Sequence, residues 1–211
     1  MPLFKSISVP GGLLSVWHIT ESSDDLLVHF SPDETTDPAF AKFTFEKRKT
    51  EWLATRALIK QMIGSTFQIS YTESGKPLLN HPLYSHISIS HSREFVAVLI
   101  HSQLAVGIDI ESMNRNYAPI RKKYLSETEL ENVSEHPVYQ CLYWCAKEAV
   151  FKIAEEDGVD FRKQIQISAF DFQQNSFSAR FISANKERVY QLHHTSFHSH
   201  CMVWVCSDPV V

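Results

Sequence analysis

Two carboxylates on one alternating stretch are the residues of this sequence best suited to metal chemistry. Apolar residues alternate with Ala105, Gly107, Asp109 and Glu111 over residues 104–111, which predicts a strand with one apolar face. Residues two apart on one face of a strand lie roughly 6.5–7 Å from each other, so both acids can reach one ion. An ordinary solvated strand face is the alternative explanation for an isolated Asp-x-Glu.

A third carboxylate falls within the strongest helical pattern of the chain, which begins at Pro137 and is expected to run to about Glu156. Glu148 and Lys152 are four residues apart, so they are neighbours on one side of this helix, away from its apolar stripe. A stabilising surface ion pair is the alternative to a catalytic role, because such pairs are frequent on exposed helices.

Candidate phosphate-binding groups precede the acidic strand. Residues 73–77 form a predicted turn that contains Lys76, but a Walker loop would need another glycine and no proline after the lysine. Ser90 and His91 end a predicted strand, and their hydroxyl and imidazole groups suit a phosphate. A plain turn and a polar hairpin corner are the alternatives. A Ser-His hydrolase is disfavoured, because adjacent strand residues point apart and no G-x-S-x-G motif is present.

Short strands and two long helices must position these groups. The first helix is predicted over residues 40–63, with Trp52 and Leu53 on its buried side and Arg48 and Arg56 on its polar side. Strands are predicted over residues 13–19, 26–30, 67–71, 87–92, 95–100, 104–111, 165–170, 177–182, 188–192 and 202–206. Residues 31–38 and 112–119 are predicted loops.

This order of elements predicts an α+β protein rather than an alternating βαβ fold. We expect two similar α+β subdomains related by a pseudo-twofold, each an antiparallel sheet packed with a long helix. Their predicted bounds are residues 1–102 and 103–211, which meet near Ser102 and Gln103. The metal site then falls in the second half.

Bulk properties narrow the function classes. The chain has 211 residues and a net charge of −4, which gives no general electrostatic case for nucleic-acid binding. The basic runs at residues 47–49 and 121–123 are explained as solvated helix faces. No window approaches a membrane span and the N-terminus lacks a secretory pattern, so a cytoplasmic protein is expected. The four cysteines lack zinc-site spacing and are expected to be free thiols.

Three blocks in a fixed order give the sequence a family resemblance. They are Gly75-Lys76-Pro77 with Ser90-His91-Ser92, then Val106-Gly107-Ile108-Asp109-Ile110-Glu111, and then Trp144-Cys145-Ala146-Lys147-Glu148-Ala149-Val150-Phe151-Lys152. With these blocks the chain resembles the 4'-phosphopantetheinyl transferases of the larger, surfactin-synthetase-activating type. The last block fits that family's W-x-x-K-E-[AS]-x-x-K, and the match extends over roughly residues 40 to 156.

The resemblance implies a holo-[acyl-carrier-protein] synthase type of enzyme, which moves the phosphopantetheine arm of coenzyme A onto a carrier-protein serine and releases 3',5'-ADP. It implies that Asp109, Glu111 and Glu148 hold Mg²⁺ against the pyrophosphate, a use suited to a hard cation with oxygen ligands. Glu148, or a water on the metal beside it, would take the serine proton, and Lys152 would neutralise or protonate the departing phosphate. Gly107 would leave room for the ligand on the acidic face.

The same resemblance implies a nucleotide grip, chiefly on the 3'-phosphate, by Lys76, Ser90 and His91, with Arg48 or Arg56 as further contacts. The site would lie between the two halves. Glu129 corresponds to an acidic residue implicated in some members of the family. It also completes an S-x-x-E helix capping box, which explains it equally well.

Coenzyme A and an acyl or peptidyl carrier protein are thus the implied partners, and two fused halves favour a monomer. An acidic helical carrier could dock on apolar and basic groups that follow the acidic strand. These are Tyr117, Ile120, Arg121, Lys122, Lys123, Tyr124 and Leu125.

Two other function classes are compatible with parts of the pattern. A Mg²⁺-dependent nuclease also places carboxylates on a strand, but usually has a lysine two residues after the last acid, where this chain has Met113. A catalytically silent carrier-binding module could retain the fold, although all the metal and lysine positions are filled here.

Overall fold

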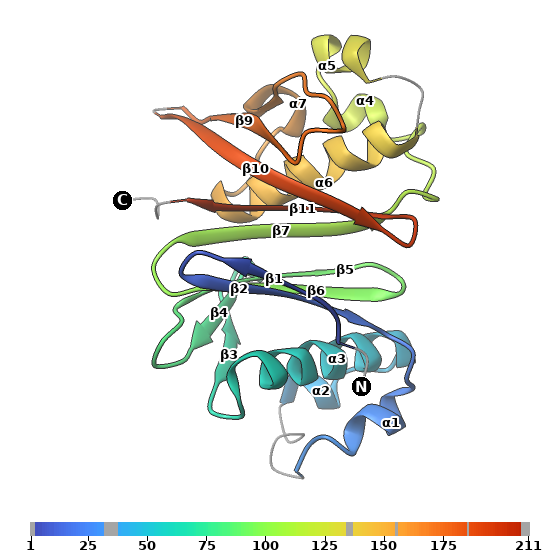
Figure 1. Ribbon diagram of the computed structural model, residues 1–211, viewed down its shortest axis with the longest axis vertical. Helices are drawn as coiled ribbons and strands as arrows, with labels where there is room; N and C mark the ends of the chain where they lie inside the picture. Colours follow the sequence, from blue (N-terminus) through green and yellow to red (C-terminus); the bar gives the residue numbers. More distant parts are fainter. Residues whose placement is uncertain (1–2, 32–37, 134–136, 155, 185, 208–211) are drawn as a thin grey trace.

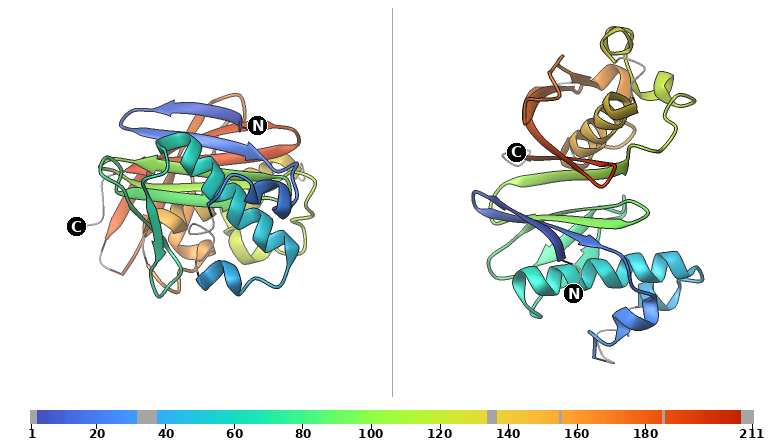
Figure 2. Two further views of the ribbon diagram at one scale, coloured as in Figure 1. Left: turned by 90° about the horizontal axis from the view of Figure 1, so that it is seen from below. Right: turned by 45° about the vertical axis from the view of Figure 1, so that its right-hand side comes forward.

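Two antiparallel sheets lie face to face, and a long helix covers the outer side of each (Figure 1). The computed structural model describes residues 3–31, 38–133, 137–154, 156–184 and 186–207. The right-hand view of Figure 2 shows the same stacking, with the C-terminal helix above the sheets and the N-terminal one below. The protein is therefore a mixed α/β structure with antiparallel sheets, in agreement with the α+β prediction.

The first sheet has four strands in the order β1-β2-β6-β5. Their bounds are Leu3–Val9, Gly12–His18, Phe95–His101 and His86–His91. The helix α3 (Glu46–Ile63) packs on β2 and β6 through Leu53 and Leu58, which meet Trp17, Val96 and Val98. A short hairpin of β3 (Gln68–Tyr71) and β4 (Pro77–Asn80) connects α3 to β5.

The second sheet has five strands in the order β7-β11-β10-β9-β8. Their bounds are Ala105–Ser112, His200–Ser207, Glu187–Phe197, Ser176–Ile182 and Ile165–Ile167. The helix α6 (Pro137–Ala154) packs on β7 and β11 with the predicted stripe of Leu142, Ala146, Ala149 and Ile153. Antiparallel pairing joins β7 to β11 along its whole length, with Asp109 opposite Val203.

An apolar core fills the space between the two sheets. Leu14, Phe95 and Leu99 of the first sheet meet Ile108 and Ile110 of β7 in one buried cluster. Ile108 and Ile110 are fully buried, because the first sheet covers the apolar face of β7. The other face of β7 lies under α6, so this strand is enclosed on both sides.

Several predicted elements differ from the structure at their boundaries or in type. Residues 26–30 were expected to be a strand, but helix α1 (Ser23–Leu27) lies there, with Ser22 and Asp25 forming a capping box at its start. The predicted first helix is divided into α2 (Pro38–Ala41) and α3. Strand β1 was not predicted. The predicted loop at 31–38 lies largely outside the described residues.

Three further short helices lie between β7 and β8. They are α4 (Arg121–Tyr124), α5 (Glu127–Asn132) and α7 (Phe161–Gln164). In the described parts of the chain, no helix is long and apolar enough to cross a membrane. The cysteines Cys141, Cys145, Cys201 and Cys206 are free, as predicted.

Candidate active site between the sheets

Asp109 stands at the centre of the candidate site, where β7 emerges between α6 and the first sheet. Its side chain is buried, and its Oδ1 accepts hydrogen bonds from Ser90 Oγ at 2.7 Å and from Lys152 Nζ at 2.9 Å. Lys152 also donates to the Ile108 carbonyl at 2.8 Å. The second oxygen of Asp109, Oδ2, is buried without a protein partner. One oxygen is thus fixed while the other is left to accept a ligand.

Glu111 lies two residues further along β7 and is half-buried. Arg115 donates to its Oε1 and lies near the faces of Tyr117 and Trp144, with ring centroids 5.4 and 5.3 Å from the guanidinium carbon. Burial, followed by the negative charge of Asp109, raises the pKa of Glu111, and Arg115 opposes that rise. In the structure the Glu111 carboxylate is therefore engaged by an arginine.

Glu148 projects from α6 toward the two acids of β7. Burial and then the negative charge of Asp109 raise its pKa to about 7, with a further contribution from Glu111. The ion pair of the neighbouring Lys152 runs to Asp109 on β7. The alternative explanation for Lys152 was a surface ion pair with Glu148 on the same helix. The structure instead pairs Lys152 with Asp109.

The donor set of these three carboxylates fits a hard divalent cation. Oxygen ligands suit Mg²⁺, and the buried Oδ2 of Asp109 lacks a partner. Burial and then repulsion by Asp109 raise the pKa of Glu148, and a cation would relieve both. Within the described residues, however, no three His, Cys, Asp or Glu side chains are grouped as ligands of one ion. Convergence of Asp109, Glu111 and Glu148 on one ion remains a prediction.

Gly107 has a different role from the one expected. A methyl group at this position would overlap the carbonyl oxygen of Ala149 and approach Val205 to 3.3 Å. The missing side chain therefore makes room for the backbone of α6 rather than for a pyrophosphate. This close approach brings Glu148 and Lys152 of α6 next to Asp109.

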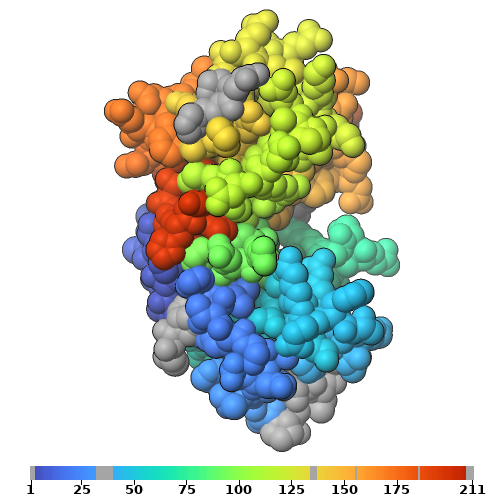
Figure 3. Space-filling model, turned by 90° about the vertical axis from the view of Figure 1, so that its right-hand side faces the viewer, coloured from blue at the N-terminus to red at the C-terminus, as the bar shows by residue number. Residues whose placement is uncertain are grey.

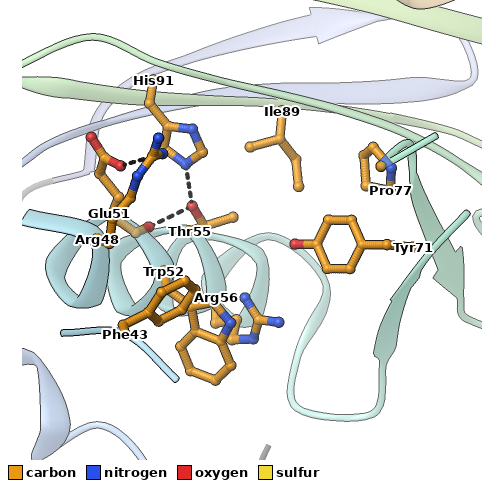
Figure 4. A pocket seen from close by; sticks show the side chains of 11 residues that line it. Phe43, Arg48, Glu51, Trp52, Thr55, Arg56, Tyr71, Pro77, Ile89 and His91 are labelled. Atoms are coloured by element: carbon orange, nitrogen blue, oxygen red, sulfur yellow. Dashed lines mark hydrogen bonds and ion pairs between the residues drawn. The ribbon is translucent and has the colours of Figure 1, made fainter. Parts of the chain in front are cut away.

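A cavity of about 310 Å³ lies between the polar side of α3 and the edge strand β5 (Figure 4). Its lining includes Arg48, Arg56, Tyr71, Pro77 and His91. Arg56, on the predicted polar side of α3, is only 8% exposed and forms part of the wall of this cavity. Its guanidinium carbon lies 3.3 Å from the ring centroid of Trp52, an arrangement that holds the cation flat against the indole.

His91 is held in one orientation at this cavity. Thr55 Oγ1 donates to the Glu51 carbonyl at 2.7 Å and lies 2.8 Å from His91 Nε2. A hydroxyl has one hydrogen, so Nε2 is the donor in the second contact and Nδ1 is unprotonated in the neutral ring. Desolvation, followed by the positive charges of Lys152 and Arg48, lowers the pKa of His91 to about 4, although part of the residue remains exposed.

A second cavity, of about 410 Å³, lies between the β3–β4 hairpin, β5 and the end of α6. Lys76, Pro77, Phe151 and Lys152 are in its lining. In Figure 3 the hairpin, in teal, projects from the molecule beside a hollow. Pro77 borders both cavities, so the two are neighbours on either side of the hairpin loop.

The structure divides the predicted nucleotide-binding residues into three groups. Arg48, Arg56 and His91 line the first cavity, and Lys76 lines the second. Ser90 borders neither cavity, because its hydroxyl points to β7.

Glu129 belongs to a buried ion pair. Its Oε2 accepts from Lys147 Nζ at 2.6 Å and from the Ser126 backbone amide at 2.7 Å, while its Oε1 accepts from the Ile167 amide at 2.8 Å. Lys147 is fully buried and also donates to the Phe161 and Ile165 carbonyls. The capping box is present, and these contacts give Glu129 a structural role in joining α5, α6 and β8.

The expected apolar docking surface after β7 is mostly core. Tyr117, Tyr124 and Leu125 are at most 1% exposed, and the Tyr124 hydroxyl donates to the Gln140 carbonyl. Lys122 and Lys123 remain at the surface. The part of the prediction that assigned these three apolar side chains to a partner is therefore wrong.

Sequence reasoning missed two contributors to the site and its support. Arg115 lies in a polar stretch that was predicted to be a loop, although its spacing of four residues from Glu111 is that of a helical ion pair. Lys147 was noted only as part of a motif, and nothing local indicates that its charge is buried.

Comparisons with known proteins agree with the sequence resemblance. Residues 105–206, just under half of the chain, match the family model described as the 4'-phosphopantetheinyl transferase superfamily. The chain is 28% identical over 129 residues to the 4'-phosphopantetheinyl transferase AcpT of Salmonella typhimurium, an alignment of 58% of this chain and 67% of the relative. AcpT of Escherichia coli K12 is 31% identical over 112 residues, which are 50% of this chain and 57% of the relative.

A 4'-phosphopantetheinyl transferase of Bacillus subtilis is 34% identical over 87 residues, which are 39% of this chain and 38% of that protein. The matched segments thus span from about two fifths to about two thirds of the length of these relatives. In sequence, residues 105–206 are thus similar to the 4'-phosphopantetheinyl transferase superfamily, and longer stretches of the chain are similar to individual transferases.

Proposed function

We propose that this protein transfers the 4'-phosphopantetheine arm of coenzyme A to a serine of an acyl or peptidyl carrier protein and releases 3',5'-ADP. One observation carries the proposal: Lys152 of α6, which is bonded to the buried Asp109, lines a cavity that adjoins the one lined by Arg48, Arg56 and His91. A long two-part substrate with a pyrophosphate at its centre suits such a site. The family match provides the reaction class.

The transfer forms a bond between the carrier serine oxygen and the phosphorus that bears the pantetheine arm, and it breaks the bond from that phosphorus to the oxygen of 3',5'-ADP. Glu148 is the proposed base for the serine proton, because its carboxylate lies beside Asp109 and Lys152, and burial followed by the charge of Asp109 raises its pKa to about 7 in the free protein. Lys152 is placed to neutralise the leaving phosphate, since its ammonium lines the second cavity beside Asp109.

Asp109, Glu111 and Glu148 would hold a magnesium ion, which when bound would neutralise charge on the pyrophosphate. Asp109 offers its Oδ2, and Glu111 would exchange Arg115 for the cation. The nucleotide is proposed to occupy the first cavity, where Arg48, Arg56 and His91 meet its phosphate and base. A bound 3'-phosphate would favour the protonated imidazole of His91, whose pKa is lowered in the free protein by desolvation and then by nearby positive charges.

We further propose that the protein is of the surfactin-synthetase-activating type and works as a cytoplasmic monomer. The proposed boundary near Ser102 and Gln103 separates the four-stranded sheet with α3 from the five-stranded sheet with α6. Basic side chains at Lys122 and Lys123 support contact with an acidic carrier.

Mass spectrometry of an apo carrier protein, incubated with this chain, coenzyme A and Mg²⁺, tests the reaction directly. We expect the carrier to gain the mass of one phosphopantetheine and Asp109→Ala to abolish that gain. Absence of the mass shift with acyl, peptidyl and aryl carriers would contradict the proposal. Plasmid DNA incubated with the protein and Mg²⁺ should stay uncut, and cleavage would favour the nuclease alternative.

A further inference from the structure

Ser90 connects the first sheet to the central carboxylate of the second. Its buried hydroxyl donates to Asp109 Oδ1 at 2.7 Å and accepts from the Ile110 amide at 3.3 Å. Both hydrogen-bonding roles of the hydroxyl are therefore used by β7. The side chain also lies away from both cavities, in contrast to its neighbour His91.

The contacts of Asp109 are unequal at its two oxygens. Oδ1 receives two donors, Ser90 Oγ and Lys152 Nζ, whereas Oδ2 is buried with no protein partner. Two donors that reach Oδ1 from different elements, β5 and α6, keep the carboxylate from turning about its last bond, so its other oxygen keeps a fixed direction. Ser90 in turn accepts a hydrogen bond from the backbone amide of Ile110, the residue that follows Asp109 on β7.

We propose that Ser90 is a positioning residue for Asp109, which orients Oδ2 toward a divalent cation. This inference rests on the proposed function, because the cation is part of it. Hydrogen bonds that orient metal ligands commonly change metal affinity by about 10- to 100-fold when they are removed. Without the Ser90 hydroxyl, Oδ1 would be held only by Lys152 on α6, and the carboxylate could then turn.

Ser88 provides a matched control on the same strand. It is as buried as Ser90, points to the same side of β5, and its Oγ accepts from the Ile108 amide at 3.1 Å. It therefore makes the same kind of contact with β7, but it is not bonded to Asp109. Loss of either hydroxyl leaves one β7 amide without its acceptor, and only loss of Ser90 releases the carboxylate.

The test is the affinity for Mn²⁺, measured by isothermal titration calorimetry on the full chain with and without coenzyme A. We expect Ser90→Ala to weaken Mn²⁺ binding about tenfold and Ser88→Ala to leave it within about twofold of the parent protein. Ser90→Thr, which keeps the hydroxyl, should restore most of the affinity. Urea unfolding should show similar losses of stability for the two alanine variants.

Two results would overturn the inference alone: Mn²⁺ affinity unchanged by Ser90→Ala, or weakened equally by Ser88→Ala. A parent protein that binds no Mn²⁺ in either condition would overturn both the inference and the proposed metal site. Mn²⁺ binding that depends on Ser90, in a protein that modifies no carrier, would overturn the proposed transfer and support the positioning role.

Discussion

Lys147 has a charged end group with no exposed surface, a costly placement that needs several partners. Burial lowers the pKa of its ammonium, and the adjacent Glu129 carboxylate opposes that change. Three acceptors surround the ammonium, at 2.6, 2.9 and 2.6 Å, which matches its three hydrogens. The lysine next to the proposed base Glu148 therefore serves the fold.

We predict that Lys147→Met lowers the free energy of unfolding by about 3–5 kcal/mol, because it leaves the buried Glu129 charge without its counter-ion. Urea unfolding followed by circular dichroism measures this change. Lys163→Met is the control, since the Lys163–Asp160 pair is exposed and should contribute at most about 1 kcal/mol. A loss below that of the control would show that Glu129 is satisfied without the lysine.

Arg115 is bonded to the Glu111 carboxylate, which is proposed to bind the cation. Removal of Arg115 should therefore strengthen cation binding, whereas removal of the Ser90 hydroxyl should weaken it. We predict that Arg115→Ala tightens Mn²⁺ binding by roughly twofold to fivefold, the equivalent of a partly exposed ion pair of up to about 1 kcal/mol. The same titration measures it, with Arg121→Ala as a control for loss of one positive charge. Weaker binding in Arg115→Ala would show that the arginine orients Glu111 instead of competing for it.

Single residues of the site could be predicted from sequence only where a motif named them. Asp109, Glu148 and Lys152 were assigned through the family resemblance of their motifs, and the structure brings Lys152 to Asp109. The partner of Ser90 could not be predicted, because the nineteen positions that separate it from Asp109 are bridged only by packing of two sheets. The orientation of one hydroxyl depends on that packing.

At the scale of elements, β7 and α6 form the unit on which the site depends. They touch backbone to backbone at Gly107 and Ala149, which places the acids of the strand beside Glu148 of the helix. Strand β7 is covered on both faces, by the first sheet and by α6. The alternating pattern of residues 104–111 had indicated a strand with one exposed face. Small residues at 105 and 107 fit the closeness of the helix.

We predict that Gly107→Ala destabilises the protein by about 3 kcal/mol, at the upper end for overpacked sites, since the methyl group meets a backbone carbonyl that cannot rotate away. Urea unfolding measures the loss. Gly64→Ala is the control, because its methyl group would meet no atom within 4 Å and only the positive φ of 82° opposes it, at about 1 kcal/mol. Equal losses would mean that α6 moves easily away from β7.

Elements with a strong period were predicted well, and those fixed by local capping or long-range pairing were not. The helix from Pro137 and most strands lie where expected. The segment at residues 26–30 is short and largely apolar, so its periodicity could not distinguish a strand from a helix. Ser22 and Asp25, three residues apart, do carry the pattern of a helix capping box. Strand β1 exists because β2 offers it a partner, a fact that a local pattern does not contain.

For the whole molecule, the apolar layer between the sheets is the feature that makes the site possible. Groups from both sides meet at Asp109, so the relative placement of the sheets sets the geometry of the candidate site. The sequence predicted two α+β halves but not that their sheets pack face to face, because each strand pattern shows only which residues are buried and not what covers them.

We predict that Ile108→Ala, a truncation in the middle of that layer, lowers stability by about 2–5 kcal/mol and affects both sheets together. Hydrogen exchange followed by mass spectrometry should show peptides of β2 and of β9 losing protection to the same extent. Val189→Ala, at a position 67% exposed, should change neither. Loss of protection in the second sheet alone would indicate that the two sheets unfold independently.

The register of β7 with β11 has a consequence for synthesis of the chain. β7 is complete at Ser112, but the strand that pairs with its whole length begins only at His200. At usual translation rates this interval is roughly 5–20 seconds. During that time the nascent chain carries a finished apolar strand with an open edge, and we expect this stretch to be the segment that a ribosome-associated chaperone must shield.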